Sequence, residues 1–431
     1  MSAKPLKIAV AGLGTVGAEV VRILAADAGL LTARAGRPIQ VTDVSARDRA
    51  KDRGVDLSAY TWHDDAAEMA ANADVDLVVE LVGGADGAAH AVVRNALAAG
   101  RHVVTANKAM LAKHGVALAA QAEDGGRILA YEAAVAGGIP VVKALREGLA
   151  GNRVSGISGI LNGTCNFILT TMRETGRSFG DVLKEAQDLG YAEADPAFDI
   201  DGNDAGQKLA IMASIAFGIP VDEQAVYLEG ITSVSADDIA FADELGYRIK
   251  LLGIARQTDA GIEQRVHPVM IDRTAPLGQI EGVTNAVQLE GSAVGSIVLT
   301  GPGAGAGATA SSVLSDLVDI AAGRSCPTFG IPHGRLRKLP AAPLERLVSA
   351  FYLRLMVWDK PGVIANVAGA LGRHGVSLES VLQRGRDPGE VVPVVMVLHE
   401  CEERAIRASL SEIEQLDSVA EKPTLIRIAG R

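Results

Sequence analysis

The chain has 431 residues, of which 48% are hydrophobic, so it is long enough to form two or three domains with sizeable cores. The 41 Lys and Arg residues and 52 Asp and Glu residues give a net charge of −11, which argues against a nucleic-acid-binding surface. Three widely spaced cysteines, Cys165, Cys326 and Cys401, predict neither a disulfide framework nor a cysteine-rich zinc site. The sequence has no signal-peptide core and no apolar run of bilayer length, so we expect a cytoplasmic protein without membrane partners.

A glycine-rich motif lies close to the N-terminus, between an apolar run at 7–12 and a stretch with helical spacing at 18–26. It consists of Gly12, Leu13, Gly14, Thr15, Val16 and Gly17. Gly12 permits a tight turn, Gly14 lets a pyrophosphate approach the backbone, and Gly17 lets the helix pack on the strand. The helix N-terminus then offers N–H groups to the phosphates. This context favours a dinucleotide-binding turn over an ordinary glycine-rich turn.

Alternating strand and helix patterns follow the glycine motif. The predicted strands are 39–44, 75–81, 102–105 and 127–131, and the predicted helices are 87–99 and 108–122. Such alternation predicts the α/β class and a Rossmann-like, doubly wound parallel sheet.

Two residues at predicted strand ends are candidates for cofactor contact. Asp43 lies inside the second strand, whereas Arg47 follows it and is suited to pair with a 2′-phosphate, which favours NADP while leaving NAD acceptable. Lys108 opens a helix directly after the strand at 102–105, where ligands bind in such sheets. The alternatives are a solvated loop arginine and a helix-start lysine in water.

The segment 188–208 concentrates acidic residues before a predicted helix that starts near Asn203. Asp204 and Lys208 are four residues apart and share one face of that helix. An ammonium held by a carboxylate can exchange a proton with a carbonyl oxygen during hydride transfer. Glu193 and Asp199 precede the pair and are candidates to bind a substrate ammonium. A solvent-facing salt bridge is the alternative.

The glycine motif, the sequence TANK at 105–108 and the run GYAEADPAFDIDGNDAGQK at 190–208 together resemble the homoserine dehydrogenase family. With residues 301–324 included, the resemblance covers about residues 5–340. It implies NAD(P)-dependent interconversion of L-homoserine and L-aspartate 4-semialdehyde, in the biosynthesis of threonine, methionine and isoleucine. The rival functions are another NAD(P)-dependent amino-acid dehydrogenase and a non-catalytic sensor of NAD(P) and amino acids.

The family's residue roles carry over to matching positions. Lys208 resembles the lysine that donates a proton to the aldehyde oxygen, and Lys108 resembles a second lysine near the nicotinamide and the substrate. The resemblance implies that the acids Glu193, Asp199 and Asp204 bind the substrate or orient the lysine. Gly190 matches a backbone position beside the cofactor.

The resemblance implies functions for two further glycine-rich loops. Family members bind a monovalent cation, typically sodium, in a turn that matches 131–140, through the positions Glu132, Val135, Gly137 and Ile139. Backbone carbonyl oxygens suit such an ion, although a plain interdomain turn is the alternative. The loop at 300–309 precedes a helix predicted at 310–322 that returns to the nucleotide domain, so that Gly303 and Gly305 would contact the cofactor. A flexible hinge is the alternative there.

The C-terminal part follows a linker-like segment at 336–349 and resembles the ACT domain, a βαββαβ module. A strand at 351–357, a helix at 363–373 and a second strand that begins at 376 and ends at Gln383 fit this order. The turn before the helix often binds a small amino acid, such as threonine, and matches Asp359, Gly362, Val363 and Ile364. A dimerising module without a ligand is the alternative.

Three domains are expected: a nucleotide-binding domain of residues 1–134 and 301–340, an α+β domain for substrate binding and dimerisation at 135–300, and an ACT regulatory domain at 350–431. The middle domain should hold a mostly antiparallel sheet, with strands at 154–162, 262–271 and 285–299. Edge strands of ACT modules tend to pair between subunits, so a homodimer or homotetramer is expected.

Overall fold

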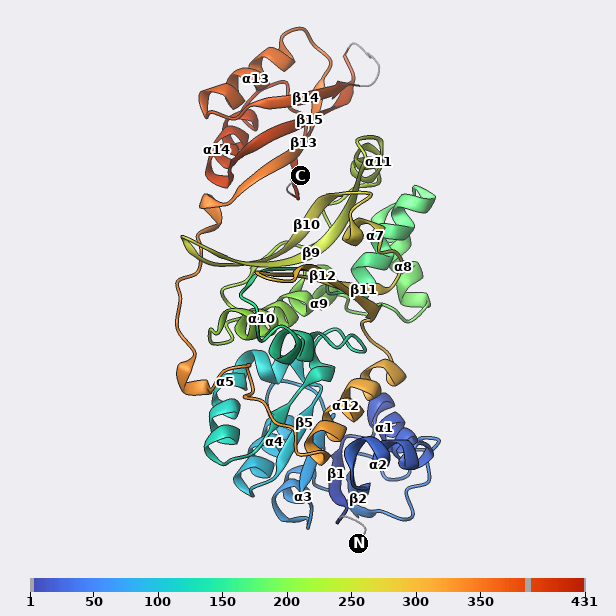
Figure 1. Ribbon diagram of the computed structural model, residues 1–431. Helices are drawn as coiled ribbons and strands as arrows, with labels where there is room; N and C mark the ends of the chain where they lie inside the picture. The colour runs from blue at the N-terminus through green and yellow to red at the C-terminus, as the bar shows by residue number, and fades with distance from the viewer. Residues whose placement is uncertain (1–3, 384–388, 430–431) are drawn as a thin grey trace.

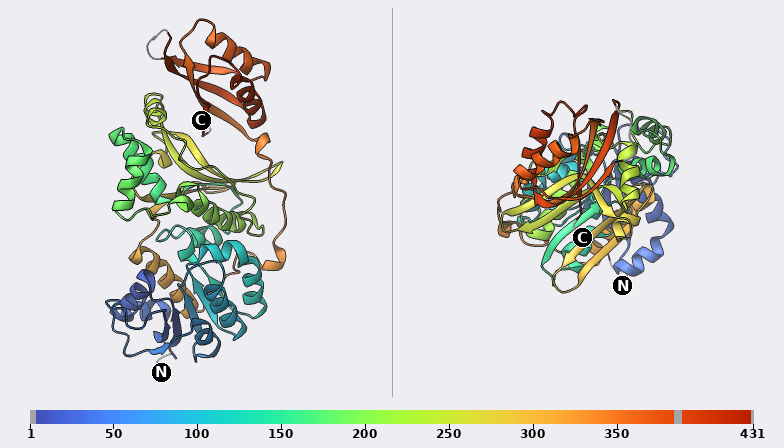
Figure 2. Two further views of the ribbon diagram at one scale, coloured as in Figure 1. Left: turned by 180° about the vertical axis from the view of Figure 1, so that it is seen from behind. Right: turned by 90° about the horizontal axis from the view of Figure 1, so that it is seen from above.

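The computed structural model describes residues 4–383 and 389–429. Three units lie one above another in Figure 1, with the N-terminal unit at the bottom and the C-terminal unit at the top. An extended segment runs along one side of the middle unit and joins the lower part of the molecule to the C-terminal unit, as both side views show (Figures 1 and 2). No helix among these residues is both long and apolar enough to cross a membrane.

The N-terminal unit contains a six-stranded sheet in the order β3-β2-β1-β4-β5-β6, in which every pair is parallel. Its strands are β1 (Leu6–Ala11), β2 (Ile39–Ser45), β3 (Thr61–His63), β4 (Leu77–Glu80), β5 (His102–Thr105) and β6 (Leu129–Ala130). Apolar side chains bury the central strands on both faces, as parallel sheets require. The predicted doubly wound α/β fold is confirmed. The order of the strands reverses between β1 and β4, where such sheets bind ligands.

Helices cover this sheet, and one of them comes from far along the chain. They are α1 (Thr15–Ala26), α2 (Ala28–Ala35), α3 (Ala66–Asn72), α4 (Ala88–Ala98), α5 (Lys108–Asp124) and α12 (Ala306–Ala321). Val313 and Leu317 of α12 are fully buried in the same apolar cluster as Ile8 of β1 and Val20 of α1. The chain therefore returns to the first unit after it has built the second.

The turn from β1 into α1 leaves no space for side chains at two of its three glycines. Gly12 has a φ of +99°, and a Cβ there would lie 2.5 Å from the carbonyl carbon of Leu81. A Cβ on Gly17 would lie 2.0 Å from the carbonyl oxygen of Gly12. A Cβ on Gly14 would meet nothing within 4 Å, so this position faces open space.

A second, ten-stranded sheet has the order β12-β11-β7-β9-β10-β16-β13-β15-β14, with β8 paired to β10. In the middle unit it contains β7 (Val154–Ile160), β8 (Tyr227–Leu228), β9 (Tyr247–Thr258), β10 (Gly261–Asp272), β11 (Thr284–Gly291) and β12 (Gly295–Pro302). The stretch 285–299, expected to have strand character, is an antiparallel hairpin of β11 and β12. The helices packed on this part are α7 (Gly163–Thr175), α8 (Phe179–Asp188), α9 (Ala197–Ile200), α10 (Asn203–Phe217) and α11 (Ala236–Glu244).

The C-terminal unit has the predicted βαββαβ order. Its elements are β13 (Val348–Trp358), α13 (Val363–Arg373), β14 (Leu378–Gln383), β15 (Val391–Glu402), α14 (Glu403–Ile413) and β16 (Thr424–Ile428). β16 also pairs in parallel with β10, where Val269 lies opposite Arg427. The middle and C-terminal units therefore share one continuous sheet, which the sequence pattern did not indicate.

The two glycines at the start of the β1–α1 turn should respond differently to the same substitution. We expect Gly12→Ala to lower the free energy of unfolding by about 2–3 kcal/mol, because it combines a positive φ with a backbone clash. Gly14→Ala should change stability by less than about 0.5 kcal/mol, since its Cβ has free space and its φ is −72°. Urea denaturation measures both, and equal losses would contradict the account of the turn.

Candidate functional site

The centre of the site is an ion pair on the first turns of α10. Gly202, in the left-handed conformation, precedes the helix and lets Asp204 enter its first turn. The Nζ of Lys208 lies 2.7 Å from Oδ2 of Asp204, one helical turn away, and 2.7 Å from the carbonyl oxygen of Leu161. Both charged residues are buried, at 6% and 9% exposure, so this pair is not the solvated salt bridge considered as the alternative.

The same carboxylate binds a second lysine, which comes from the N-terminal unit. The Nζ of Lys108, the first residue of α5, lies 3.2 Å from Oδ1 of Asp204. Asn107 caps α5 by accepting a hydrogen bond from the Met110 N–H, and the hydroxyl oxygen of Thr105 accepts one from the Asn107 N–H. These contacts fix where the helix starts, so Lys108 is aimed at the interface between the first two units.

Glu80 supports this arrangement from the neighbouring strand. One of its carboxylate oxygens accepts a hydrogen bond of 2.5 Å from the Thr105 hydroxyl, and the other accepts the N–H groups of Val82 and Gly83. Glu80 is completely buried. The ends of β4 and β5 are therefore tied together directly below Lys108.

Asn162 completes the cluster, and sequence reasoning missed it. Its side-chain N–H groups donate to Oδ1 of Asp199 and to Oδ2 of Asp204, each at 2.9 Å. Its side-chain oxygen caps α7 by accepting from the Cys165 N–H. An asparagine followed by Gly and Thr at the end of a strand is a helix N-cap pattern, and this signal was available in the sequence.

The surroundings of the cluster shift the pKa values of Asp204 and Asp199 in opposite directions. Burial would raise the pKa of Asp204, but the ammonium groups of Lys208 and Lys108 lower it to about 2. Burial, together with the charge of Asp204, raises the pKa of Asp199 above its usual value. Asp204 is therefore a carboxylate throughout the neutral range and acts on protons only through its partners.

Cys165 lies beside this cluster, where its thiol donates to the carbonyl oxygen of Asp199 at 3.3 Å. Burial, assisted by the negative charge of Asp199, raises the pKa of the thiol well above its usual value. Cys165 is therefore a protonated thiol with no nucleophilic character at neutral pH.

The contacts of Lys208 leave one of its N–H groups for proton exchange. An ammonium carries three N–H groups, and Leu161 and Asp204 accept two of them. The remaining N–H is available to a further oxygen acceptor. A buried ammonium held in this way can give a proton to an alkoxide or take one from an alcohol.

Other candidates lie outside the cluster. In the part of the chain that the structure describes, no hydrogen bond or ion pair joins the exposed side chain of Glu193 to it, although the Glu193 carbonyl accepts a hydrogen bond from Gln187. Gly190 is exposed and has a φ of +75°. Both residues lie in the loop that links α8 to α9, at its solvent side.

The glycine turn leads into a helix start that has no side-chain cap. α1 begins at Thr15 without a side-chain cap and without an acidic residue in its first turn, so its N-terminus can bind an anion. Arg47 is exposed two residues beyond β2, and Asp43 stays inside that strand, paired with His63 at 2.6 Å. Arg53 from the same loop donates to the Leu13 carbonyl at 3.0 Å, so the loop after β2 lies against the glycine turn.

The two later glycine loops touch each other. A Cβ on Gly137 would lie 2.4 Å from the carbonyl oxygen of Gly303, and Gly305 precedes α12 with a φ of +113°. The Gly137 carbonyl accepts from the Ser312 hydroxyl at 2.6 Å, and the Ile139 carbonyl accepts from the Val141 N–H at 2.7 Å. The Gly137 carbonyl of this turn therefore contacts α12, whereas the Ile139 carbonyl is bonded within its own segment.

The side chain of Glu132 holds the far end of this turn. Its two oxygens accept hydrogen bonds from the N–H groups of Val142 and Lys143, at 2.9 and 2.8 Å. Burial and the nearby charge of Asp316 raise its pKa to about 7. Among the residues described, no group of three or more His, Cys, Asp or Glu side chains is placed to hold a metal ion.

The C-terminal unit presents a free helix start at the predicted effector position. Gly362 precedes α13 with a φ of +90° and provides no side-chain cap, so the N–H groups of Val363 and Ile364 belong to the first turn. The backbone N–H of Asp359 donates to the Glu390 carbonyl at 3.0 Å. Gln383 is the last residue of β14.

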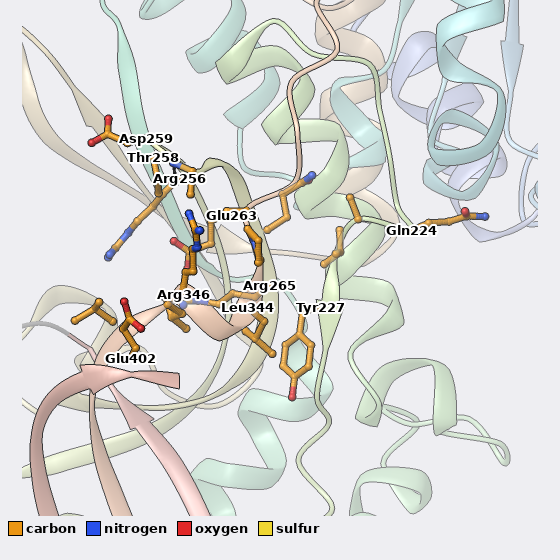
Figure 3. Close-up of a pocket in the computed structure, with 18 residues that line it drawn as sticks. Gln224, Tyr227, Arg256, Thr258, Asp259, Glu263, Arg265, Leu344, Arg346 and Glu402 are labelled. Carbon is orange, nitrogen blue, oxygen red and sulfur yellow. Dashed lines mark hydrogen bonds and ion pairs between the residues drawn. The ribbon is translucent and has the colours of Figure 1, made fainter. Parts of the chain in front are cut away.

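A cavity of about 670 Å³ lies elsewhere, between the β9–β10 hairpin and the segment that leads to the C-terminal unit. Figure 3 shows Arg265, Arg346 and Glu402 around it, with Tyr227 at one side. None of the candidate catalytic, substrate, cofactor, cation or effector residues lines this cavity.

Comparisons with known proteins agree along the whole chain. Residues 140–318 match the family model described as homoserine dehydrogenase, residues 12–132 match the homoserine dehydrogenase NAD binding domain, and residues 351–418 match the ACT domain. A homoserine dehydrogenase of Pseudomonas aeruginosa is 46% identical over 99% of both chains.

Solved structures give the same result. A homoserine dehydrogenase from Thiobacillus denitrificans superposes with a TM-score of 0.94 at 42% identity, over 99% of both chains. A hyperthermophilic archaeal homoserine dehydrogenase in complex with NADPH has a TM-score of 0.64 at 25% identity and covers 78% of this chain and 100% of its own. The matched domains, the full-length relatives and the fold agree, and the chain belongs to the homoserine dehydrogenase family of NAD(P)-dependent oxidoreductases, with a C-terminal ACT domain.

Proposed function

We propose that the reduction of L-aspartate 4-semialdehyde to L-homoserine, and its reverse, takes place between Lys208 and Lys108. The observation that supports this is the single buried carboxylate of Asp204 that contacts lysines from two different domains. The nicotinamide supplies or accepts the hydride when it is bound. Lys208 donates a proton to the oxygen that becomes the alcohol, and takes it back in the reverse direction.

The other groups orient and bind. Asp204 holds both ammonium groups in place and remains ionised, because its pKa is about 2. Asp199, fixed by Asn162 at 2.9 Å, binds the ammonium group of the amino-acid substrate. Glu193, on the exposed loop between α8 and α9, would contribute a second carboxylate to the substrate, and the Gly190 backbone of the same loop would contact the cofactor.

Replacement of the proton donor tests this assignment. Lys208→Ala should lower kcat by about 10³-fold, because the developing alkoxide loses its proton source. The dissociation constant of the cofactor should stay within about twofold, since Lys208 lies on α10 and not on the glycine turn. Stopped-flow absorbance of the nicotinamide and fluorescence titration measure the two quantities, and undiminished turnover would discard the mechanism.

The turn at Gly12–Gly17 and the uncapped N-terminus of α1 would hold the pyrophosphate of the cofactor. Gly303 and Gly305, at the start of α12, would supply further backbone contacts to it. NADP is the favoured cofactor, with NAD also accepted, because Arg47 stands exposed just beyond β2 on the loop that contacts the glycine turn.

The preference for NADP has a direct test at Arg47. Arg47→Ala should raise the KM for NADPH about tenfold, since one charge-assisted contact to the 2′-phosphate is lost. The KM for NADH should be unchanged, because NADH has no 2′-phosphate. Initial rates with each cofactor at saturating aldehyde separate these outcomes, and equal effects on both cofactors would contradict the role of Arg47.

The carbonyl oxygens of Glu132, Val135, Gly137 and Ile139 would hold a monovalent cation, sodium by preference. Backbone carbonyl oxygens are hard ligands that suit such an ion, and the Gly137 carbonyl lies at the contact with Ser312 of α12. The Asp316 carboxylate of α12 also accepts the Glu132 N–H at 2.9 Å, so a negative charge lies close to the turn. A bound ion would fix Gly137 against Gly303 and so hold the two domains in register.

Removal of the ion should therefore loosen the molecule. We expect dialysis into a tetramethylammonium buffer to lower the thermal midpoint by several degrees, and millimolar sodium chloride to restore it. Tetramethylammonium chloride at equal ionic strength is the control. A midpoint that is independent of the cation would contradict sodium binding.

The ACT domain provides the sensing function. An amino-acid effector such as threonine binds at Asp359, Gly362, Val363 and Ile364, where the uncapped start of α13 offers N–H groups to a carboxylate. β14 forms the outer edge of the shared sheet and has an exposed face, which favours pairing with a second copy in a homodimer or homotetramer. The cytoplasm remains the expected location.

A further inference from the structure

The ACT domain contacts the middle unit, which we call the catalytic domain, through strand pairing and through charged side chains. Besides the pairing of β16 with β10, two arginines of the ACT domain, Arg427 and Arg354, bind buried or half-buried acids of the catalytic domain. The cavity of Figure 3 separates the hairpin of β9 and β10 from the nearby linker. These two arginines therefore add charged contacts to the strand pairing and to a shared apolar cluster that includes Tyr352 and Ile426.

Arg427 acts as a clamp. Its Nε and Nη2 bind the two oxygens of Glu403 at 2.9 and 2.6 Å, and its Nη1 lies 3.0 Å from Oε2 of Glu229. The Tyr227 hydroxyl donates to the same oxygen of Glu229 at 2.9 Å. Arg427 is only 3% exposed, so water screens its charge poorly. The strength of the pairing therefore depends closely on the distances and angles between the guanidinium and the two carboxylates.

Arg354 makes the second connection. Its Nε lies 2.7 Å from Oδ1 of Asp238, which also accepts from the Tyr352 hydroxyl at 2.9 Å. Asp238 is completely buried and forms the capping box of α11 with Ser235. The ACT domain thus holds both ends of residues 229–238, which we call the bridging segment.

The bridging segment packs against α9, next to the cluster of Asp199, Asp204, Lys208 and Asn162. The Ile231 N–H donates to the Ile200 carbonyl at 3.0 Å, and a Cβ on Gly230 would lie 2.4 Å from the same oxygen. Ile200 ends α9, directly after Asp199, and Gly202 then leads into α10 and Asp204. With no space between the segments, a displacement of residue 230 displaces the backbone that carries both acids.

We propose that Arg427 and Glu229 are positioning residues for the reaction: through the bridging segment, the ACT domain holds α9 and Asp199 where the substrate binds. This inference rests on the substrate role proposed above for Asp199. It also gives an effector on the ACT domain a physical route to the substrate cluster, because a rotation of β16 changes the Arg427–Glu229 pair first.

The test removes the pair without altering the active site. Glu229→Gln keeps the shape of the side chain and removes its charge, and Arg427→Lys keeps a cation that cannot reach both acids at once. In the full-length protein, we expect faster deuterium uptake at residues 197–204 in both variants. The KM for L-homoserine should rise about tenfold, and the KM for the cofactor should be unchanged.

Arg407→Met is the matched control. Arg407 donates to Glu403 at 2.8 Å from a side chain that is 51% exposed, and Glu403 is the partner that it shares with Arg427. Its loss should leave both the KM and the uptake at 197–204 unchanged. The double variant Glu229→Gln/Arg427→Lys should be no worse than the more impaired single variant, because both break one connection.

The outcomes separate the inference from the proposed function. Unchanged uptake at 197–204 in Arg427→Lys overturns the inference, even if Glu229→Gln fails to fold. Faster uptake with an unchanged KM for L-homoserine supports the positioning route and instead contradicts the substrate role of Asp199.

Discussion

The site depends on one carboxylate that is shared by two ammonium groups. Asp204 binds Lys208 from its own helix at 2.7 Å and Lys108 from the other domain at 3.2 Å. A buried carboxylate is expensive unless it is paired, and here two cations and the Asn162 amide compensate for its burial. Because loss of either lysine would leave that charge poorly compensated in a buried environment, the interface between the domains is fixed by the same contact that we propose for the chemistry.

Contacts around this carboxylate explain why distant segments must meet. Lys108 is aimed by the cap of α5, which is itself fixed to Glu80 through Thr105. Asn162 caps the start of α7. Its side-chain nitrogen also donates to Asp199 and to Asp204, at 2.9 Å in each case. Each of these polar side chains is thus hydrogen-bonded or ion-paired to at least one other, as expected for a preorganised site.

The sequence allowed much of this to be predicted, because local signals determine local structure. The glycine motif and the apolar strands of the first domain predicted the parallel sheet, and the spacing of Asp204 and Lys208 predicted their contact. The role of Asn162 was missed, although an N-cap pattern marked it, because its two acidic partners lie 37 and 42 residues away. The pairing of β16 with β10 and the clamp at Arg427 depend on tertiary contacts between separate domains, for which a single sequence carries no local signal.

The position of α12 has a consequence for biosynthesis. Val313 and Leu317 of this helix fill the same core as Ile8 of the first strand, so the nucleotide-binding domain lacks part of its interior until about 320 residues have been made. During synthesis on the ribosome, the N-terminal domain cannot complete its core until the middle domain has been made, and part of its apolar surface stays uncovered until then. Folding of this chain is therefore expected to proceed from the middle domain outward and to engage chaperones at the N-terminal sheet.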